Sequence, residues 1–375
     1  MKIAFTAPMK PLDHPVPSGD RTMGRLIVKA LESLGHQVTI VSTFRAWRKE
    51  GSDAVQSAVR RDALAEADRI AEDWEKTGYR PDLFLTYHLY HKAPDWIGPS
   101  LADRFDLPYA IVEASRAPKR RTGNWAFGFA AADAALLRAD AVAALHHADA
   151  ECLAAIVPHQ RLSVLLPFLD AAPYLQASGQ AKPLAAQPLK LLAVGMMREG
   201  DKQRSYEVLA EALGHVRDLP WHLTLIGDGP VRDHVLGLFP PDRITWLGAL
   251  GGEDLPQQYA CHDLFVWPAI REAFGLVLLE AQAAGLGVVA GDTFGVPDIV
   301  RDGETGLLSP EGDAAALAAN LRRVLQEPAL ADRMGVAAHR HILEVHTLPA
   351  GAARLEALAE KTIRNHLRRR ETQDT

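Results

Sequence analysis

Residues 263–313, DLFVWPAIREAFGLVLLEAQAAGLGVVAGDTFGVPDIVRDGETGLLSPEGD, decide the fold of this chain. An apolar β run at 264–267 stops at Pro268, and a loop leads to an apolar helix that starts after Phe274 and Gly275; a second β run follows at 287–290. This order predicts a βαβ unit with its loop at the carboxyl end of a strand, where open α/β sheets bind ligands. The helix N-terminus offers unpaired N–H groups that favour a phosphate.

Two carboxylates of this stretch indicate what it binds. Glu272 precedes the helix and Glu280 lies inside it, so their backbones would be about 12 Å apart along a helix axis. The carboxyl pairs of glycosidases lie roughly 5–9.5 Å apart, which makes this spacing long for that chemistry. It suits an elongated ligand with phosphates in the middle, such as a nucleotide-sugar. Two solvated helix glutamates are the alternative, but Gly275, the flanking strands and the expected GETGLL turn at 303–308 favour a ligand site.

The stretch resembles the donor-binding signature of the retaining family 4 glycosyltransferases, members of the glycosyl transferases group 1. The resemblance covers about half of the chain and continues upstream through LLAVGMMREGDK (191–202), LTLIGDGP (223–230) and ITWLGAL (244–250). It implies the GT-B fold, an α/β architecture of two Rossmann-like domains with doubly wound parallel sheets that face each other across a cleft. It also implies retention of the anomeric configuration.

The same resemblance assigns roles to individual donor-side residues. It implies that Glu272 binds hydroxyls of the donor sugar and that Glu280 binds the ribose. It further implies that the backbone of Phe274, Gly275 and Leu276 binds sugar and phosphate.

Length and composition agree with two domains and exclude several classes of protein. The 375 residues exceed the usual size of one core, since ~100–200 residues per domain is typical. A net charge of −6 argues against a nucleic-acid partner. Cys152 and Cys261 suggest neither a disulfide framework nor a zinc site. The start, MKIAFTAP, reads as a strand, and no apolar run approaches the ~20 residues of a membrane span, so a cytoplasmic protein is expected.

Alternation of short buried strands with helices predicts a parallel sheet in each domain. The strands are expected at 2–7, 37–43, 82–87, 108–113, 141–145 and 162–166, and then at 189–195, 222–227, 243–248, 264–267 and 288–290. The division expected is an acceptor-side domain at 1–170, a linker at 171–188, a donor domain at 189–348 and a C-terminal segment at 349–375. Resemblance implies that the last helix crosses back onto the first domain. Its basic end, Arg364 and 368–370, reads as a frayed tail or a contact for anionic lipid.

The first domain offers a glycine and two strand-end side chains. Gly19 lies at a helix mouth without a G-x-G-x-x-G sequence, and the second strand lacks a closing acid, so a dinucleotide site is disfavoured. Gly19 is expected to let the backbone approach the sugar or phosphates, or simply to begin the helix. His88 follows a strand and Glu113 ends one; both are acceptor-side candidates, although a histidine there is often only packed.

A basic loop adds a third acceptor-side candidate, Arg116. The cations Arg116 and 119–121 precede Trp125, Phe127 and Phe129. One interpretation is a basic rim with aromatic residues that faces an anionic acceptor or the inner face of a membrane, which would make the protein peripheral. The other is a solvated basic turn followed by a helix that faces the core.

The departing diphosphate requires positive charge, because an exposed helix dipole contributes only ~0.3–1 kcal/mol. Family 4 enzymes place an arginine directly after the glycine that ends this strand, but here Gly195 is followed by two methionines. Arg198, beside the pliable Gly200, is expected to take that role, with Lys202 as the second cation. If Arg198 instead faces solvent, Lys202 acts with backbone amides alone. No D-x-D sequence ends a strand, so neither a metal nor another cofactor is expected.

These observations predict an enzyme, a hexosyltransferase that uses a nucleoside diphosphate sugar, UDP-linked rather than GDP-linked. Without an obvious nucleophile it would act by same-face attack, and the leaving phosphate would take the acceptor proton. The acceptor is a lipid, a polysaccharide or a small polyol. The alternatives are a nucleotide-sugar epimerase or a phosphorylase of the same fold, or a non-catalytic nucleotide-sugar-binding subunit. The sequence shows no pyridoxal lysine motif for a phosphorylase.

Overall fold

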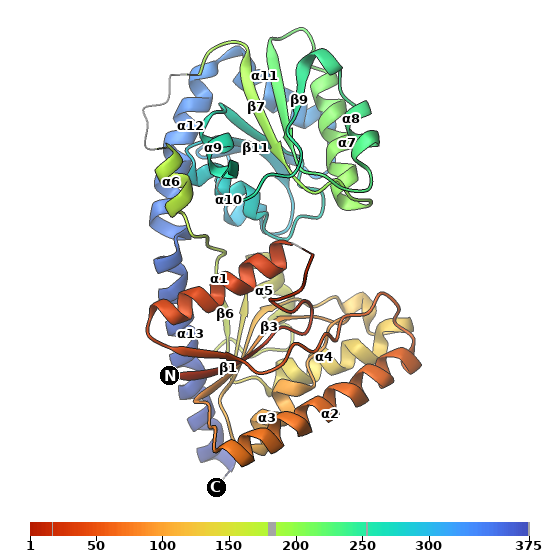
Figure 1. Cartoon of the computed structure of the whole chain (residues 1–375), viewed down its shortest axis with the longest axis vertical. Coiled ribbons are helices and arrows are strands. Elements are labelled where there is room, and N and C mark those ends of the chain that lie inside the picture. Colours follow the sequence, from red (N-terminus) through yellow and green to blue (C-terminus); the bar gives the residue numbers. More distant parts are fainter. Residues whose placement is uncertain (17, 179–184, 253, 374–375) are drawn as a thin grey trace. The chain divides into compact units, whose positions relative to one another are not determined.

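The structure, a computed structural model, describes residues 1–16, 18–178, 185–252 and 254–373. It divides into two compact units (Figure 1). The first unit comprises Met1–Pro167 together with Leu348–Thr375, and the second comprises Phe168–Thr347. Each unit has a six-stranded sheet whose strand pairs are all parallel, with helices against it. The predicted two-domain Rossmann-like α/β fold is therefore confirmed.

The sheet of the first unit has the strand order β2-β1-β3-β4-β5-β6. Its strands are β1 (Lys2–Thr6), β2 (Gln37–Ile40), β3 (Leu83–Leu89), β4 (Tyr109–Ala114), β5 (Ala141–Ala144) and β6 (Leu162–Val164). The α-helices are α1 (Gly19–Ser33), α2 (Asp53–Thr77), α3 (Ile97–Arg104), α4 (Ala126–Arg138), α5 (His147–Leu153) and α13 (Leu348–Gln373). The chain winds in opposite directions from β1 and β3, so a topological switch point lies between the carboxyl ends of these strands, the usual place for a ligand.

The sheet of the second unit has the order β12-β11-β10-β7-β8-β9. Its strands are β7 (Leu189–Val194), β8 (Trp221–Ile226), β9 (Ile244–Trp246), β10 (Leu264–Trp267), β11 (Gly287–Asp292) and β12 (Gly306–Pro310). The helices are α6 (Ala172–Ser178), α7 (Asp201–Gly214), α8 (Arg232–Gly237), α9 (Asp254–Ala260), α10 (Leu276–Ala283), α11 (Ala314–Gln326), α12 (Pro328–His341) and the π-helix Ile342–His346. Here the switch point lies between β7 and β10.

Some boundaries differ from those expected. Strand β12 occupies sequence that had been interpreted as a turn, because Gly306 opens a short edge strand beside β11. Helix α6 lies in the range expected to be a linker, in which residues 179–184 lie outside the described residues. His88 lies inside β3 and not in the loop after it, whereas Glu113 lies inside β4 as expected. Among the residues described, no helix is both long and apolar enough to cross a membrane.

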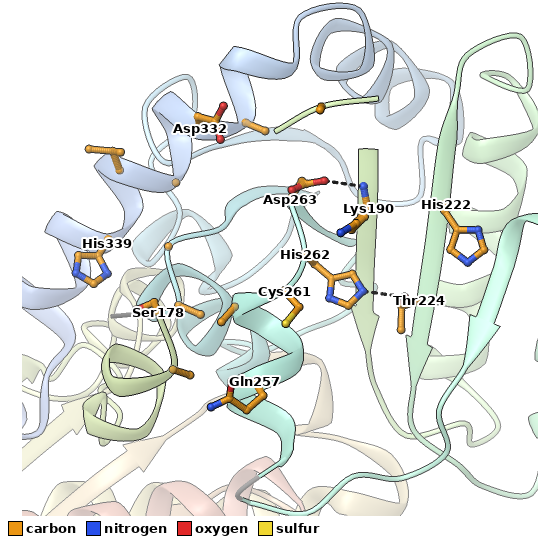
Figure 2. Close-up of a pocket in the computed structure, with 18 of the residues that line it drawn as sticks. Ser178, Lys190, His222, Thr224, Gln257, Cys261, His262, Asp263, Asp332 and His339 are labelled. Atoms are coloured by element: carbon orange, nitrogen blue, oxygen red, sulfur yellow. Dashed lines mark hydrogen bonds between the residues drawn. The ribbon is translucent and has the colours of Figure 1, made fainter. Parts of the chain in front are cut away.

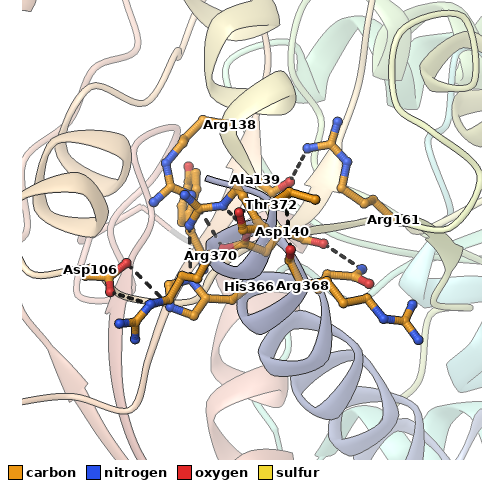
Figure 3. A network of polar contacts seen from close by, with 12 residues as sticks. Asp106, Arg138, Ala139, Asp140, Arg161, His366, Arg368, Arg370 and Thr372 are labelled. Atoms are coloured by element: carbon orange, nitrogen blue, oxygen red, sulfur yellow. Dashed lines mark hydrogen bonds and ion pairs between the residues drawn. The ribbon is translucent and has the colours of Figure 1, made fainter. Parts of the chain in front are cut away.

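Helix α13 is anchored to the sheet of the first unit through Asp140, which directly precedes β5 (Figure 3). The Asp140 carboxylate is 2% exposed and accepts hydrogen bonds from Arg369 Nε at 2.9 Å and from the Tyr109 backbone N at 3.0 Å. Arg370 Nε lies 3.1 Å from Asp106 Oδ2. Arg369 and Arg370 are therefore paired with carboxylates of their own unit, which corrects the expectation that this basic end is a frayed tail.

We expect Asp140→Ala to lower the free energy of unfolding by about 3 kcal/mol, the lower end for a broken buried pair because Arg369 keeps some solvent contact. Urea denaturation followed by circular dichroism measures this loss. The control is Asp106→Ala, whose side chain is 51% exposed and whose removal should cost less than about 1 kcal/mol. Equal losses in the two variants would show that Asp140 does not anchor the helix.

Candidate donor and acceptor sites

Two charged side chains meet at the switch point of the second sheet. Lys202, in the first turn of α7, donates a hydrogen bond from Nζ to Glu272 Oε2. Trp267, the last residue of β10, donates from Nε1 to the same oxygen at 3.3 Å. Lys202 Nζ also lies 5.2 Å from the centroid of the Trp267 ring, a cation–π contact. Both charged side chains are 18% exposed, so a charge placed beside them would be only partly screened by water.

The chain supports this pair with close contacts behind it. The Tyr206 hydroxyl donates to the Gly195 carbonyl at 2.7 Å, and its ring lies edge-on against Trp267. A Cβ at Gly195 would lie 2.8 Å from the Trp267 ring, so only glycine allows strand β7 to approach that ring. Sequence reasoning missed Trp267 because it ends an apolar run that predicts only burial, and it missed Tyr206 because its contact with Trp267 is tertiary.

The loop that carries Glu272 is fixed by side chains from elsewhere in the unit. Ser205 Oγ accepts a hydrogen bond from the Ile270 backbone N at 3.1 Å, and Ser205 is 1% exposed. Ala269 and Arg271 have φ of 56° and 49°, in the left-handed region that non-glycine residues seldom adopt. Gly275 has φ of 61°, and a Cβ there would lie 3.2 Å from Glu272 Cγ. The backbone that precedes α10 therefore holds Glu272 in one place.

Glu280 has partners that the sequence did not reveal. It lies in the second turn of α10, where its Oε2 accepts a hydrogen bond from the Tyr259 hydroxyl at 2.9 Å. Tyr259 is 0% exposed and its ring packs against Tyr174 of α6, a residue of the range expected to be a linker. Burial raises the pKa of Glu280, and the hydrogen bond from Tyr259 opposes that rise. Phe274 and Leu276, at the entry of α10, are mostly buried.

Arg198 differs from Lys202 in its surroundings. Arg198 is exposed, and among the described residues its side chain has no carboxylate partner. Met197 beside it is buried, with its backbone N bonded to the Asp228 carbonyl at 3.0 Å. A Cβ at Gly229 would lie 2.2 Å from the Met197 carbonyl oxygen, so the chain at Met197 is closely packed. The structure thus brings Lys202 to Glu272 and leaves Arg198 exposed in the loop that precedes α7.

In the first unit, Asp20, His88 and Glu113 come together. His88 Nδ1 lies 3.2 Å from Asp20 Oδ1 and 3.3 Å from Glu113 Oε1. Burial alone would lower the pKa of His88, but the charges of Glu113 and Asp20 outweigh it and raise that pKa to about 9. Burial raises the pKa of Glu113 to about 7, and the His88 charge only partly offsets this. Gly19 is the first residue of α1, with open space where a Cβ would lie.

Arg116 does not belong to an exposed basic rim, which corrects that interpretation. Its Nε and Nη2 donate to the two oxygens of Asp133 at 2.8 and 2.9 Å, and its side chain is 4% exposed. The guanidinium also lies 4.9 Å from the centroid of the buried Phe129 ring. Residues 119–121 are exposed, whereas Trp125 is buried. The loop is therefore a solvated basic turn that leads into a helix facing the core.

A cavity of about 1110 Å³ opens at the other edge of the second sheet, beside the amino ends of β7, β8 and β10 (Figure 2). The Lys190 backbone N donates to Asp263 Oδ2 at 2.9 Å, and His262 Nε2 lies 2.7 Å from Thr224 Oγ1. These polar groups satisfy one another. The charged pair and the helix N-terminus at the carboxyl edge are better suited to a nucleotide-sugar, despite the size of this cavity.

The family match falls within the second unit, which carries the Lys202–Glu272 pair. The sequence profile of the family Glycosyl transferases group 1 matches residues 188–327. Over 155 residues, the chain is 35% identical to a sulfoquinovosyl transferase of Arabidopsis thaliana, a match that covers 40% of this chain and 30% of that relative. Over 196 residues it is 30% identical to a D-inositol 3-phosphate glycosyltransferase of Streptomyces bingchenggensis, covering 49% and 39%. The matches thus span less than half the length of these curated relatives.

Solved structures resemble almost the whole chain. A sucrose-phosphate synthase from Thermosynechococcus elongatus superposes with a TM-score of 0.74 at 20% identity, covering 96% of this chain and 98% of that one. HepE of Anabaena in complex with UDP gives 0.71 at 17% identity, covering 96% and 100%. These likenesses show the GT-B fold. Residues 188–327 therefore resemble the glycosyl transferases group 1 family, and both curated relatives named above are glycosyltransferases.

Proposed function

We propose that the protein is a retaining glycosyltransferase that moves a hexose or related sugar from a nucleoside diphosphate sugar to an acceptor hydroxyl. The observation that carries the proposal is the Lys202–Glu272 pair at the β7/β10 switch point of a glycosyl transferases group 1 domain. Solved structures of Anabaena HepE contain UDP or UDP-glucose, which supports a UDP-sugar as the donor of this chain.

In this proposal the cations hold the diphosphate while Glu272 holds the sugar. The Lys202 ammonium has three N–H donors, so it can contact Glu272 and a phosphate oxygen together. Arg198 lies exposed in the loop that precedes α7, from which its guanidinium can grip two phosphate oxygens. The backbone of 274–276, at the N-terminus of α10, contacts sugar and phosphate. As the glycosyl bond breaks, negative charge grows on the leaving oxygen, and these groups stabilise it without a metal on the diphosphate. That oxygen takes the acceptor proton on the same face of the sugar.

Glu280 is proposed to bind the ribose, with Tyr259 as a positioning residue. We expect Tyr259→Phe to raise the KM for the donor about two- to tenfold, the value of one hydrogen bond, with kcat little changed. The control is Tyr79→Phe in the first unit, because the Tyr79 hydroxyl makes no hydrogen bond to any described residue. Steady-state kinetics separate the two constants. A fall in kcat at constant KM would remove Tyr259 from this role.

The acceptor is proposed to bind the first unit near Gly19, His88 and Glu113.

An anionic membrane surface is proposed to attract the exposed residues 119–121, each cation contributing about 1 kcal/mol. Because Trp125 and Phe129 are buried, this attraction is mainly electrostatic and should weaken at high salt. Flotation with anionic liposomes is expected and flotation with neutral ones is not; equal behaviour on both would refute the membrane contact.

A donor screen tests the proposed function. The full chain is incubated with UDP- and GDP-sugars, with and without lipid extract, polysaccharide or polyols, and released nucleoside diphosphate is measured. Release that depends on an acceptor is expected. Interconversion of free nucleotide-sugars without an acceptor would instead indicate an epimerase. Donor binding without release under any condition would indicate a non-catalytic binding subunit.

A further inference from the structure

Three side chains of the first unit converge at its topological switch point. Asp20 follows β1 in the first turn of α1, His88 lies at the end of β3, and Glu113 at the end of β4. One ligand-type atom from each residue lies within 4.8 Å of the other two. His88 and Glu113 both have φ of 60°, in the left-handed region that non-glycine residues seldom adopt. The backbone therefore departs from regular strand geometry at both positions.

These side chains do not satisfy one another. His88 Nδ1 lies 3.2 and 3.3 Å from the two carboxylates, but among the described residues no contact to this nitrogen has the geometry of a hydrogen bond. Within the described part of the chain Glu113 Oε2 also has no hydrogen-bond partner, and Glu113 is 7% exposed. A third such atom is the hydroxyl of Tyr87, which is 1% exposed and whose pKa is raised by burial and by the charge of Glu113. Buried polar atoms are usually paired, so these three atoms leave capacity open for a ligand at this place.

The two distances from His88 Nδ1 to the carboxylates fit a metal ion. An ion about 2.0–2.2 Å from each of two ligands separates those ligands by roughly 3.0–3.5 Å. The two distances from His88 Nδ1 fall in that range. A bound cation would also balance two carboxylates that now share one imidazole. Asp20 further senses the positive charge of Lys10, and Asp149 adds negative potential at Glu113.

We propose that Asp20, His88 and Glu113 form a binding site for a divalent transition-metal ion. One imidazole and two carboxylates suit Mn²⁺ or Zn²⁺, whereas Ca²⁺ and Mg²⁺ prefer oxygen ligands alone. The ion displaces the proton from His88 Nδ1 and takes that nitrogen, Asp20 Oδ1 and Glu113 Oε1 as ligands. The remaining coordination positions take water or another oxygen ligand. Tyr87 supports the site through its hydroxyl beside Glu113. This site lies outside the donor groups, and metal binding does not rest on the proposed function.

Metal binding by the full chain tests the proposal directly. The chain is stripped with a chelator, and Mn²⁺ alone is titrated at pH 8 while free Mn²⁺ is followed by electron paramagnetic resonance. One bound ion per chain is expected, displaced by Zn²⁺. Asp20→Asn, His88→Gln and Glu113→Gln should each weaken binding at least about tenfold. The matched control is Glu72→Gln on α2, an exposed carboxylate of the same unit, which should bind Mn²⁺ as the natural chain does.

Two further measurements keep the proposal testable if a variant does not fold. Mn²⁺ should raise the melting temperature of the natural chain, because the ion binds only the folded state. Zn²⁺ should shift the ring nitrogen signals of His88 in nuclear magnetic resonance, with loss of the Nδ1 proton. No bound ion at millimolar Mn²⁺, or a His88 ring that keeps both protons in the presence of Zn²⁺, would overturn the proposal in favour of an imidazolium held between two carboxylates. Equal Mn²⁺ binding by the natural chain and all three site variants would also overturn it.

Discussion

Replacing Glu272 with glutamine is expected to lower turnover at least about 100-fold, the loss seen when one group that stabilises a transition state is removed. The amide keeps the size of the carboxylate and can still accept a hydrogen bond from Trp267 Nε1. It cannot balance the charge of Lys202 or accept a charged hydrogen bond from a sugar hydroxyl as the bond to the diphosphate breaks. Nucleotide affinity should stay nearly unchanged, because the nucleotide is held by other groups.

Turnover and nucleotide affinity are measured on the same preparation of Glu272→Gln. The control is Glu304→Gln, since Glu304 is half-exposed on the same unit and pairs only loosely, at 3.5 Å, with Arg301. That variant should turn over normally. An unchanged rate in Glu272→Gln would remove Glu272 from the site, and a loss of nucleotide affinity alone would make it a binding group with no special role in the transition state.

Removing Arg198 is expected to lower turnover about ten- to a hundredfold, since a charged hydrogen-bonded contact contributes about 1.5–3 kcal/mol. The melting temperature of Arg198→Ala should not change, because that side chain is exposed. Lys202→Ala should also lose turnover, but with a lower melting temperature, since it leaves the mostly buried Glu272 without its cation. The two variants therefore differ in stability while they agree in rate.

Arg204→Ala is the matched control for both cations. Arg204 lies on α7, is 55% exposed and pairs with Glu207, so its loss should affect neither rate nor stability appreciably. Normal turnover in Arg198→Ala together with a loss in Lys202→Ala would show that Lys202 and backbone amides suffice. Arg198 would then not replace the arginine that the family pattern places after the glycine.

The fold could be predicted because buried parallel strands are continuous apolar runs between turn residues. Strand β10 was predicted at its observed bounds for this reason. Strand β12 was missed because Gly306 and Pro310 at its two ends are typical of turns, and its pairing with β11 is a tertiary contact. Helix α6 was missed because it is short and has no buried residue to give an apolar period.

The candidate site could be predicted in part. Glu272 and Lys202 are 70 positions apart, yet each follows a strand, and β7 and β10 turned out to be neighbours at the switch point. What the sequence could not show is which partners occupy a side chain. Arg116 was expected at an exposed rim, but Asp133 one helix later holds it inside. Tyr259 was hidden for the same reason, because only the tertiary structure brings its hydroxyl to Glu280.

Calorimetry with UDP and GDP on the full chain tests most directly whether the loops at the β7/β10 switch point hold a nucleoside diphosphate. At least one of the two nucleotides should bind the natural chain, and Lys202→Ala should weaken that binding about tenfold or more, as expected for loss of a charged contact. Lys190→Ala is the matched control, because Lys190 lies on the same sheet but lines the cavity at its opposite edge. Binding that survives Lys202→Ala and fails in Lys190→Ala, or no binding of either nucleotide, would contradict the account.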